Sequence, residues 1–143
     1  MVGSITHCAG YRAAAVAPAG TLAGLGIDAE PHEPLPDGVA GVVTVAGEPE
    51  RLAALSAADP ATHWDRLLFS AKESVYKAWY PLTGRWLGFE EAELTVDPDG
   101  RFTARILVDG TRADGGPPLD VLDGHWLVAG GLLLTAVAVP RRS

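Results

Sequence analysis

Residues 64–79 read Trp-Asp-Arg-Leu-Leu-Phe-Ser-Ala-Lys-Glu-Ser-Val-Tyr-Lys-Ala-Trp, and this stretch decides the fold. Its apolar residues recur every three or four positions, which predicts one long helix with a single buried stripe. We expect Asp59 or Thr62 to cap the helix, and Pro81 with Gly84 to end it. The stripe consists of Trp64, Leu67, Leu68, Ala71, Val75, Ala78 and Trp79.

The segments before this helix predict three strands and one short helix. Gly3 to His7 and Tyr11 to Ala17 form an expected antiparallel pair, with its turn at Ala9-Gly10. Gly24 to Glu30 is the third strand, and Pro31 stops it at the start of a proline-rich loop. Glu48 to Ala57 is rich in Ala and Leu and predicts a short helix.

The segments after the long helix predict two β-hairpins. Asp97-Pro-Asp-Gly100 is a strong turn signal between strands at 92–96 and 101–108. Gly130-Gly131 separates two further strands, at 125–129 and 132–139, and residues 112–118 form a flexible connection rich in Gly and Pro. The predicted fold class is therefore α+β, with antiparallel strands packed on one long helix.

Composition limits the kind of protein this is. The chain has 143 residues, of which 48% are hydrophobic, so it is long and apolar enough for one domain with a core. Its net charge of −7 argues against a nucleic-acid-binding module, which needs a basic face. A single cysteine, Cys8, excludes an internal disulfide. With no secretory signal and no apolar run long enough for a membrane span, we expect a cytoplasmic protein that contacts neither nucleic acid nor membrane.

Asp28 and Glu30 lie two residues apart in the third predicted strand. Side chains at positions i and i+2 project from the same face of a strand, so both carboxylates can reach one cation. Hard oxygen ligands of this kind suit Mg²⁺. The alternative is that both acids lie at a solvated strand end, because Asp-x-Glu alone is a weak pattern.

Glu73 and Lys77 share one face of the long helix, and Arg66 lies on that face too. A carboxylate with cationic neighbours can complete a metal site while the cations offset phosphate charge. The alternative is an ordinary solvated helix face with one Glu–Lys pair.

Taken together and in this order, these motifs resemble those of the 4'-phosphopantetheinyl transferases. The Gly26-Ile-Asp-Ala-Glu30 strand and the helix from Phe69 to Lys77 are similar to the two main family motifs. Ser4-Ile-Thr-His7 and Gly84-Arg-Trp-Leu-Gly-Phe89 are similar to features of the Sfp-type enzymes, and in particular of the enterobactin synthetase component D subfamily. The resemblance covers essentially the whole chain.

The resemblance implies a reaction, a cofactor and a partner. Such an enzyme binds coenzyme A and Mg²⁺ and acts on an acyl or peptidyl carrier protein. A serine of the carrier attacks the β-phosphate of coenzyme A, so that 4'-phosphopantetheine moves to the serine and 3',5'-ADP leaves. The pathways served are those of siderophores or other secondary metabolites.

The resemblance also implies roles for individual residues. The expected ligands of Mg²⁺ or of its waters are Asp28, Glu30 and Glu73, and Glu73 is in addition the expected general base. The other expected roles are contacts with phosphate groups. Lys77 would stabilise the pyrophosphate and the departing phosphate, and Lys72 would touch the same phosphates. His7, with Thr6 beside it, would contact the 3'-phosphate of coenzyme A.

Members of the family are longer than this chain and resemble pseudo-dimers of two similar halves, with coenzyme A between them. We therefore expect residues 1–143 to form a single transferase domain truncated at its N-terminus. Residues 1–20 would be the last strands of the first half, and 21–143 the C-terminal half. The alternative is a non-catalytic remnant that lacks the coenzyme A-binding first half.

Overall fold

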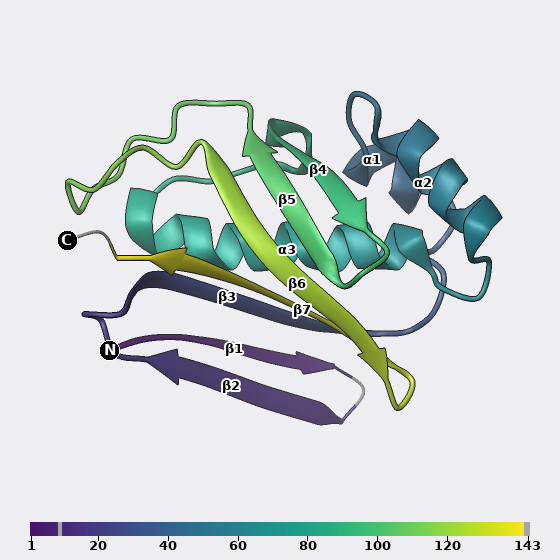
Figure 1. Ribbon diagram of the computed structural model, residues 1–143, viewed down its shortest axis with the longest axis horizontal. Helices are drawn as coiled ribbons and strands as arrows, with labels where there is room; N and C mark the ends of the chain where they lie inside the picture. Colours follow the sequence, from purple (N-terminus) through teal and green to yellow (C-terminus); the bar gives the residue numbers. More distant parts are fainter. Residues whose placement is uncertain (9, 142–143) are drawn as a thin grey trace.

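One long helix, α3 (Trp64–Thr83), crosses one face of a five-stranded antiparallel sheet in this computed structural model, which describes residues 1–8 and 10–141 (Figure 1). The strand order is β3-β7-β6-β5-β4, and β1 and β2 form a separate two-stranded hairpin. The predicted α+β class is confirmed. The other elements are β1 (Val2–Cys8), β2 (Tyr11–Ala17), β3 (Leu22–Pro31), α1 (Val39–Val43), α2 (Glu48–Ala58), the 3-10 helix η1 (Phe89–Glu91), β4 (Ala92–Asp97), β5 (Arg101–Ile106), β6 (Val121–Ala129) and β7 (Leu132–Pro140).

The apolar stripe of α3 forms the centre of the core, as its spacing predicts. All seven predicted stripe residues are buried, and they pack with the inward-facing side chains of the sheet. Trp64 also meets Trp126 of β6 edge to face, with ring centroids 5.4 Å apart. Burial of this stripe therefore fixes which side of α3 faces the sheet and which residues remain on its flanks.

The structure corrects the predicted N-terminal cap of α3 and confirms Gly84 as its C-terminal cap. The residue at the N-terminal cap is His63, whose N–H donates to the ring of His32 at 3.1 Å. The Asp59 carboxylate instead accepts hydrogen bonds from the chain just before the helix, at Ala61 and Thr62. The helix also continues through Pro81 to Thr83, because a proline in the last turn removes little of the backbone ladder.

A buried hydroxyl cluster joins α3 to β7. The hydroxyls of Ser70 and Ser74 donate to Thr135 Oγ1 at 2.9 and 2.6 Å, and the Thr135 hydroxyl donates to the Ser70 carbonyl at 3.0 Å. Every member of this cluster is thereby satisfied, which removes the usual penalty for burying polar groups. The small serine side chains also let the helix approach the sheet closely.

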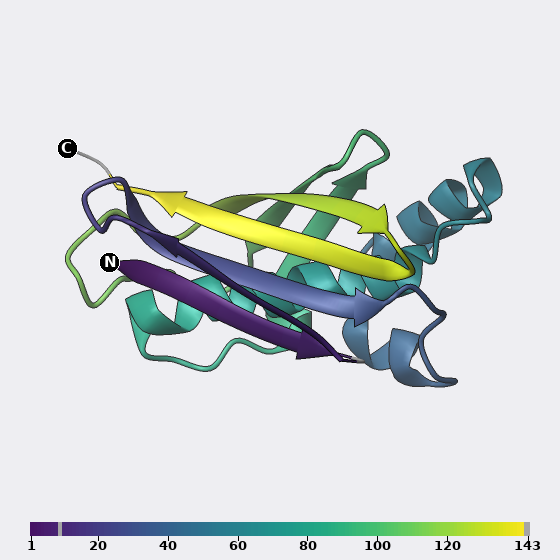
Figure 2. The same ribbon diagram turned by 90° about the horizontal axis from the view of Figure 1, so that it is seen from below.

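The β1–β2 hairpin lies alongside β3 without joining the sheet, as the view from below shows (Figure 2). Side chains make the connection: Ser4 Oγ accepts from Ile27 N–H and Thr6 Oγ1 from Ala29 N–H, each at 3.0 Å. The predicted strand pair is confirmed, with Tyr11–Ala17 matching β2. The Ala9 half of its predicted turn lies outside the described residues.

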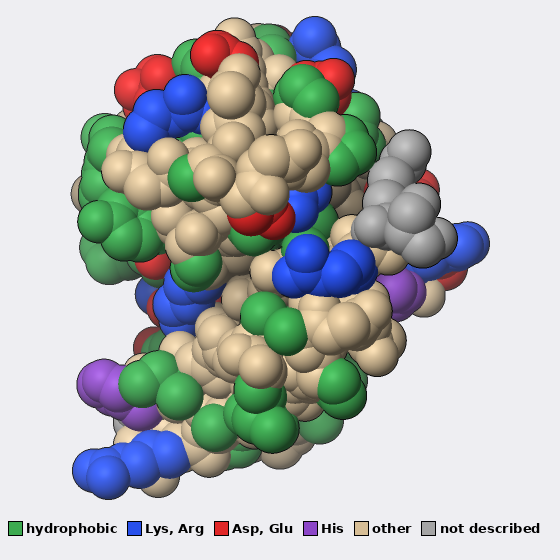
Figure 3. Space-filling view, turned by 90° about the vertical axis from the view of Figure 1, so that its left-hand side faces the viewer, with side chains coloured by type: hydrophobic (Ala, Val, Ile, Leu, Met, Phe, Trp, Pro, Cys, Tyr) green, Lys and Arg blue, Asp and Glu red, His purple; other side chains and the backbone are tan. Residues whose placement is uncertain are grey.

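The β1–β2 and β6–β7 hairpins each pair a glycine of the first strand with a valine of the second. Gly3 pairs with Val16 across the first hairpin, and Gly124 pairs with Val137 across the second. Val137 is fully buried under α3, whereas Val16 is 68% exposed and its neighbour Ile5 is 73% exposed. The corresponding face of the first hairpin is thus open, and the hairpin forms the lower part of the molecule in Figure 3. None of the described helices combines the length and apolar character needed to cross a membrane.

Gly26 of β3 marks the closest approach of strand and helix. A Cβ added there would overlap the Ser74 carbonyl oxygen and lie 2.9 Å from the Ala78 nitrogen. We predict that Gly26→Ala lowers the free energy of unfolding by about 3 kcal/mol, because neither backbone can move aside. Urea denaturation measures this change. Gly20→Ala is the control, because nothing lies within 4 Å of its Cβ. Equal stability of the two variants would contradict the close contact.

Candidate active site

Asp28 is a buried carboxylate with one unpaired oxygen. It projects from β3 toward α3 and is only 6% exposed. Its Oδ1 accepts from Lys77 Nζ at 3.3 Å, whereas Oδ2 has no hydrogen-bond partner within the described residues. A buried carboxylate oxygen without a donor is costly, so this position favours a cation beside Oδ2.

Glu30 follows on the same face of β3, next to the Asp28 carboxylate. Burial and the adjacent Asp28 carboxylate raise the pKa of Glu30 to about 7, against the opposing effect of Arg66. Arg66 Nη1 donates to Glu30 Oε1 at 3.3 Å. The two acids predicted to share a strand face therefore do so, and at neutral pH they carry together less negative charge than two isolated carboxylates.

Glu73 brings a third carboxylate to this region from the flank of α3. Its pKa is raised by burial and then by Asp28, while Lys77 acts in the opposite direction. Asp28 is therefore electrostatically coupled to both glutamates. No three or more His, Cys, Asp or Glu side chains in residues 1–8 and 10–141 form a group that could by itself hold a metal ion. The donor set nevertheless fits Mg²⁺, which takes few protein ligands and keeps several waters.

Lys77 links the acids to the N-terminal hairpin. Its ammonium group donates to the Ile27 carbonyl at 2.8 Å and to the Ile5 carbonyl at 3.3 Å, in addition to Asp28. Its side chain is still 29% exposed. The cation thus lies at the seam between β1 and β3, beside the acids, as the helix spacing predicts.

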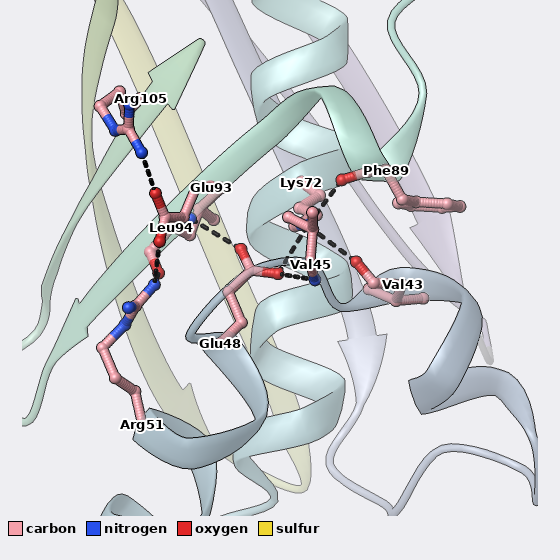
Figure 4. Close-up of polar contacts among 9 residues, drawn as sticks. All are labelled: Val43, Val45, Glu48, Arg51, Lys72, Phe89, Glu93, Leu94 and Arg105. Atoms are coloured by element: carbon pink, nitrogen blue, oxygen red, sulfur yellow. Dashed lines mark hydrogen bonds and ion pairs between the residues drawn. The ribbon is translucent and has the colours of Figure 1, made fainter. Parts of the chain in front are cut away.

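The Lys72 ammonium pairs with Glu48 rather than joining Asp28 and Lys77, and its contact with the same phosphates as Lys77 stays a prediction. Its ammonium donates to Glu48 Oε1 at 2.9 Å and to the carbonyls of Val43 and Phe89, each at 2.7 Å. All three of its protons are engaged, and the side chain is buried on the opposite flank of α3, against α1 and η1 (Figure 4). A residue next to Glu73 in a helix points about 100° away from it, and here that direction leads into the protein.

Sequence reasoning missed Glu48, the partner of Lys72. Glu48 is 1% exposed, and its carboxylate also accepts from the N–H groups of Val45 and Leu94, each at 2.7 Å. Figure 4 shows it between Lys72 and β4. A Glu before a Pro at a helix start is typical of a solvated first turn, so nothing in the sequence signals its burial.

Thr6 and His7 face opposite sides of β1. Thr6 is buried and its hydroxyl accepts from Ala29, whereas His7 is exposed on the open face of the hairpin, opposite Arg12 of β2. Adjacent strand residues must diverge in this way. His7 and Arg12 are therefore both directed to solvent at this end of the hairpin.

A hollow of about 130 Å³ is lined by Lys72, Glu73 and Tyr76 of α3 and by residues 86–89. Aromatic side chains dominate its wall: Tyr76 and Trp86 have ring centroids 5.0 Å apart, and Phe89 lies below. It suits a slender apolar group close to the Glu73 carboxylate.

The family model described as the 4'-phosphopantetheinyl transferase superfamily matches residues 24–121, a range that includes most of β3 and all of α3. This chain belongs to that superfamily. Three curated relatives agree: Svp of Streptomyces mobaraensis is 61% identical over 97% of the chain and 56% of its own length. PptT of Mycobacterium tuberculosis is 51% identical over 97% of the chain and 62% of its own length. Npt of Nocardia iowensis is 52% identical over 96% and 64%, and each is named a 4'-phosphopantetheinyl transferase. The chain spans less than two thirds of the length of these relatives.

In this member of the superfamily, the residues of the helix motif divide among three faces of α3. Ser70 and Ser74 hold the sheet, and Lys72 holds Glu48. Glu73 and Lys77 remain beside Asp28. One short motif therefore contains both the packing that fixes the helix and the charged groups of the candidate site.

The coupling of Asp28 and Glu30 predicts a pH dependence. Between its ordinary pKa of 4.5 and its folded value of about 7, Glu30 keeps a proton that the unfolded chain releases. Its contribution therefore makes the free energy of unfolding fall as the pH rises through this range. We predict a smaller fall between about pH 5 and pH 8 for Asp28→Asn, which removes the neighbouring negative charge. Urea titrations with a chelator present measure this.

Asp99→Asn is the control, because Asp99 lies in the β4–β5 turn and pairs with Arg101. It should leave the pH dependence attributed to Glu30 unchanged. The coupling is refuted if Asp28→Asn retains the full wild-type fall in stability.

Proposed function

We propose that this chain contains the metal-binding side of an Sfp-type transferase, similar to enterobactin synthetase component D. The enzyme would move 4'-phosphopantetheine from coenzyme A to a serine of an acyl or peptidyl carrier protein. The observation that carries the proposal is the buried Asp28 oxygen without a donor, beside two further carboxylates and Lys77. The names of the relatives support the same activity.

Asp28, Glu30 and Glu73 are the residues that would hold Mg²⁺ or its waters. When bound, the metal would supply positive charge against the pyrophosphate of coenzyme A. Without it, three carboxylates would repel that anion. Lys77, with part of its side chain open to solvent, is the cation of this chain that we assign to the pyrophosphate.

Glu73 is our proposed general base. The carrier serine would form a bond from its Oγ to the β-phosphorus of coenzyme A, and the bond from that phosphorus to 3',5'-ADP would break. The serine proton would pass to the Glu73 carboxylate, directly or through a water. The raised pKa of Glu73 suits this role, because a base is most effective when its pKa lies closer to the working pH.

The aromatic hollow beside Glu73 supports a place for the slender pantetheine arm of coenzyme A. Tyr76 and Trp86 would flank it, with Leu87 and Phe89 beneath. We propose that the enzyme works in the cytoplasm, in a siderophore or other secondary-metabolite pathway.

We further propose that residues 1–20 belong to the first of two similar halves and residues 21–143 to the second. The matching pairs Gly3–Val16 and Gly124–Val137 support this division. So does the open face at Ile5 and Val16, whose counterpart lies under α3. The second candidate, a remnant without coenzyme A binding, is favoured by the same open face, and a carrier-protein mass-shift assay on the 143-residue chain separates the two.

The metal and base assignments predict loss of transfer. Asp28→Ala or Glu73→Gln, made in a full-length background, should lower turnover with Mg²⁺ by at least about 100-fold, as for a general base or a metal ligand. The measurement is the mass shift of a carrier protein on gaining phosphopantetheine. Glu50→Gln is the matched control, because Glu50 is exposed on α2. Near-normal turnover in either site variant would remove that residue from the mechanism.

The predicted 3'-phosphate contact rests on His7, which is exposed beside Arg12. In a full-length background, His7→Ala should weaken coenzyme A more than dephospho-coenzyme A, by about 1.5–3 kcal/mol, the usual range for a charge-assisted hydrogen bond. Calorimetric titration of both ligands measures the difference. Equal losses for the two would show that His7 does not read this phosphate.

A further inference from the structure

We propose that Arg66 is a positioning residue that holds the Glu30 carboxylate in place beside Asp28, so that the pair can receive a divalent cation. The inference rests on the metal site of the proposed function and adds a residue that neither contacts substrate nor ligates the metal. Three observations support it: how the guanidinium is anchored, how the neighbouring residue holds the same loop, and how each of the two acids pairs with its own cation. A comparison between the effect of charge and the effect of orientation then shows how the role can be tested.

Backbone carbonyls fix the Arg66 guanidinium. Its Nε donates to the Glu33 carbonyl at 3.1 Å and its Nη2 to the Pro34 carbonyl at 2.9 Å. A guanidinium is planar and presents its donors in a rigid fork, so two anchored N–H groups determine where the third points. That third group, Nη1, meets Glu30 Oε1 at 3.3 Å, and the Arg66 side chain is only 14% exposed.

The loop that anchors Arg66 is itself held by α3. Asp65, the preceding residue, accepts from Leu35 N–H at 3.0 Å. Residues 65 and 66 therefore bind the loop after β3 at successive points, and the carbonyls that orient Arg66 cannot drift from the helix. The guanidinium that donates to the Glu30 carboxylate is therefore held in a nearly fixed position relative to α3.

Each of the two acids pairs with its own cation through one carboxylate oxygen. Lys77 engages Asp28 Oδ1, and Arg66 engages Glu30 Oε1. Each acid thereby meets its cation through one oxygen, and within residues 1–8 and 10–141 Asp28 Oδ2 has no hydrogen-bond partner. Without Arg66, the Glu30 side chain would be free to turn away from Asp28.

Charge and position predict opposite effects on cation binding. If Arg66 acted only through its positive charge, it would repel a divalent cation, and neutralising it would tighten binding. If it acts by orienting Glu30, its loss weakens binding, as loss of groups that orient metal ligands typically does by about 10–100-fold. Arg66→Lys keeps the charge but loses the planar fork, so it isolates the effect of orientation.

The experiment measures Mn²⁺ affinity of the 143-residue chain, with free Mn²⁺ followed by electron paramagnetic resonance. The variants are Arg66→Lys, Arg66→Gln and Asp28→Asn, each checked by thermal melting. Arg51→Lys and Arg51→Gln are matched controls, because Arg51 also donates to a carboxylate, Glu93 at 3.2 Å, and to a carbonyl, Leu94 at 2.8 Å. We expect both Arg66 variants to bind Mn²⁺ about tenfold or more weakly, and both Arg51 variants to bind as the wild type.

The outcomes separate this inference from the proposed function. Loss of affinity in Asp28→Asn with unchanged or tighter binding in both Arg66 variants overturns the role of Arg66 and leaves the metal site standing. Unchanged affinity in Asp28→Asn places the cation elsewhere and overturns the metal site and the role of Arg66 together. If Arg66→Gln fails to fold, Arg66→Lys decides alone, and normal affinity in that variant overturns the inference.

Discussion

The close contact between β3 and α3 is the constraint on which the rest of the structure depends. At Gly26 the strand meets the Ser74 carbonyl with no room for a side chain. The hydroxyl cluster of Ser70, Ser74 and Thr135 holds the helix at this distance from the sheet. Because carboxylates two and four residues beyond Gly26 face the same way, the contact directs Asp28 and Glu30 toward the helix flank that carries Glu73 and Lys77.

This geometry creates an electrostatic cost. Asp28 lies near Glu30 and near Glu73 in a partly dehydrated region, and burial together with the Asp28 charge raises the pKa of both glutamates. Folding alone does not require such an arrangement, because a carboxylate exposed to water at each position would avoid the free-energy cost of burial. The cost is reasonable for a site whose working partner is a cation, and the two basic residues at its edges, Lys77 and Arg66, reduce the cost without occupying the centre.

On the opposite flank of α3, buried charges contribute to the fold rather than to the candidate site. Lys72 and Glu48 form a buried ion pair in which every donor and acceptor is matched. Such a pair is costly to break but satisfied as it stands. The pair joins α3, which carries Glu73, to α2 and β4. Through the Phe89 carbonyl, Lys72 also joins α3 to the wall of the aromatic hollow. Within one motif, neighbouring residues therefore serve the fold and the site separately.

The sequence by itself determined the parts of this protein that depend on local order. The period of the apolar residues from 64 to 79 predicts α3 and its buried face, and the Gly-rich turns predict the hairpins, because both patterns follow from backbone geometry within a few residues. Asp28 with Glu30, and Glu73 with Lys77, could likewise be placed on common faces. Tertiary structure alone decided that Lys72 turns inward, that Glu48 pairs with it across 24 residues, and that Thr6 rather than His7 is the buried member of that pair in β1. It also decided that Arg66 reaches Glu30 across 36 residues. The physical reason is that burial and pairing of these charges depend on which segments distant in the chain meet, and residue spacing carries no record of that.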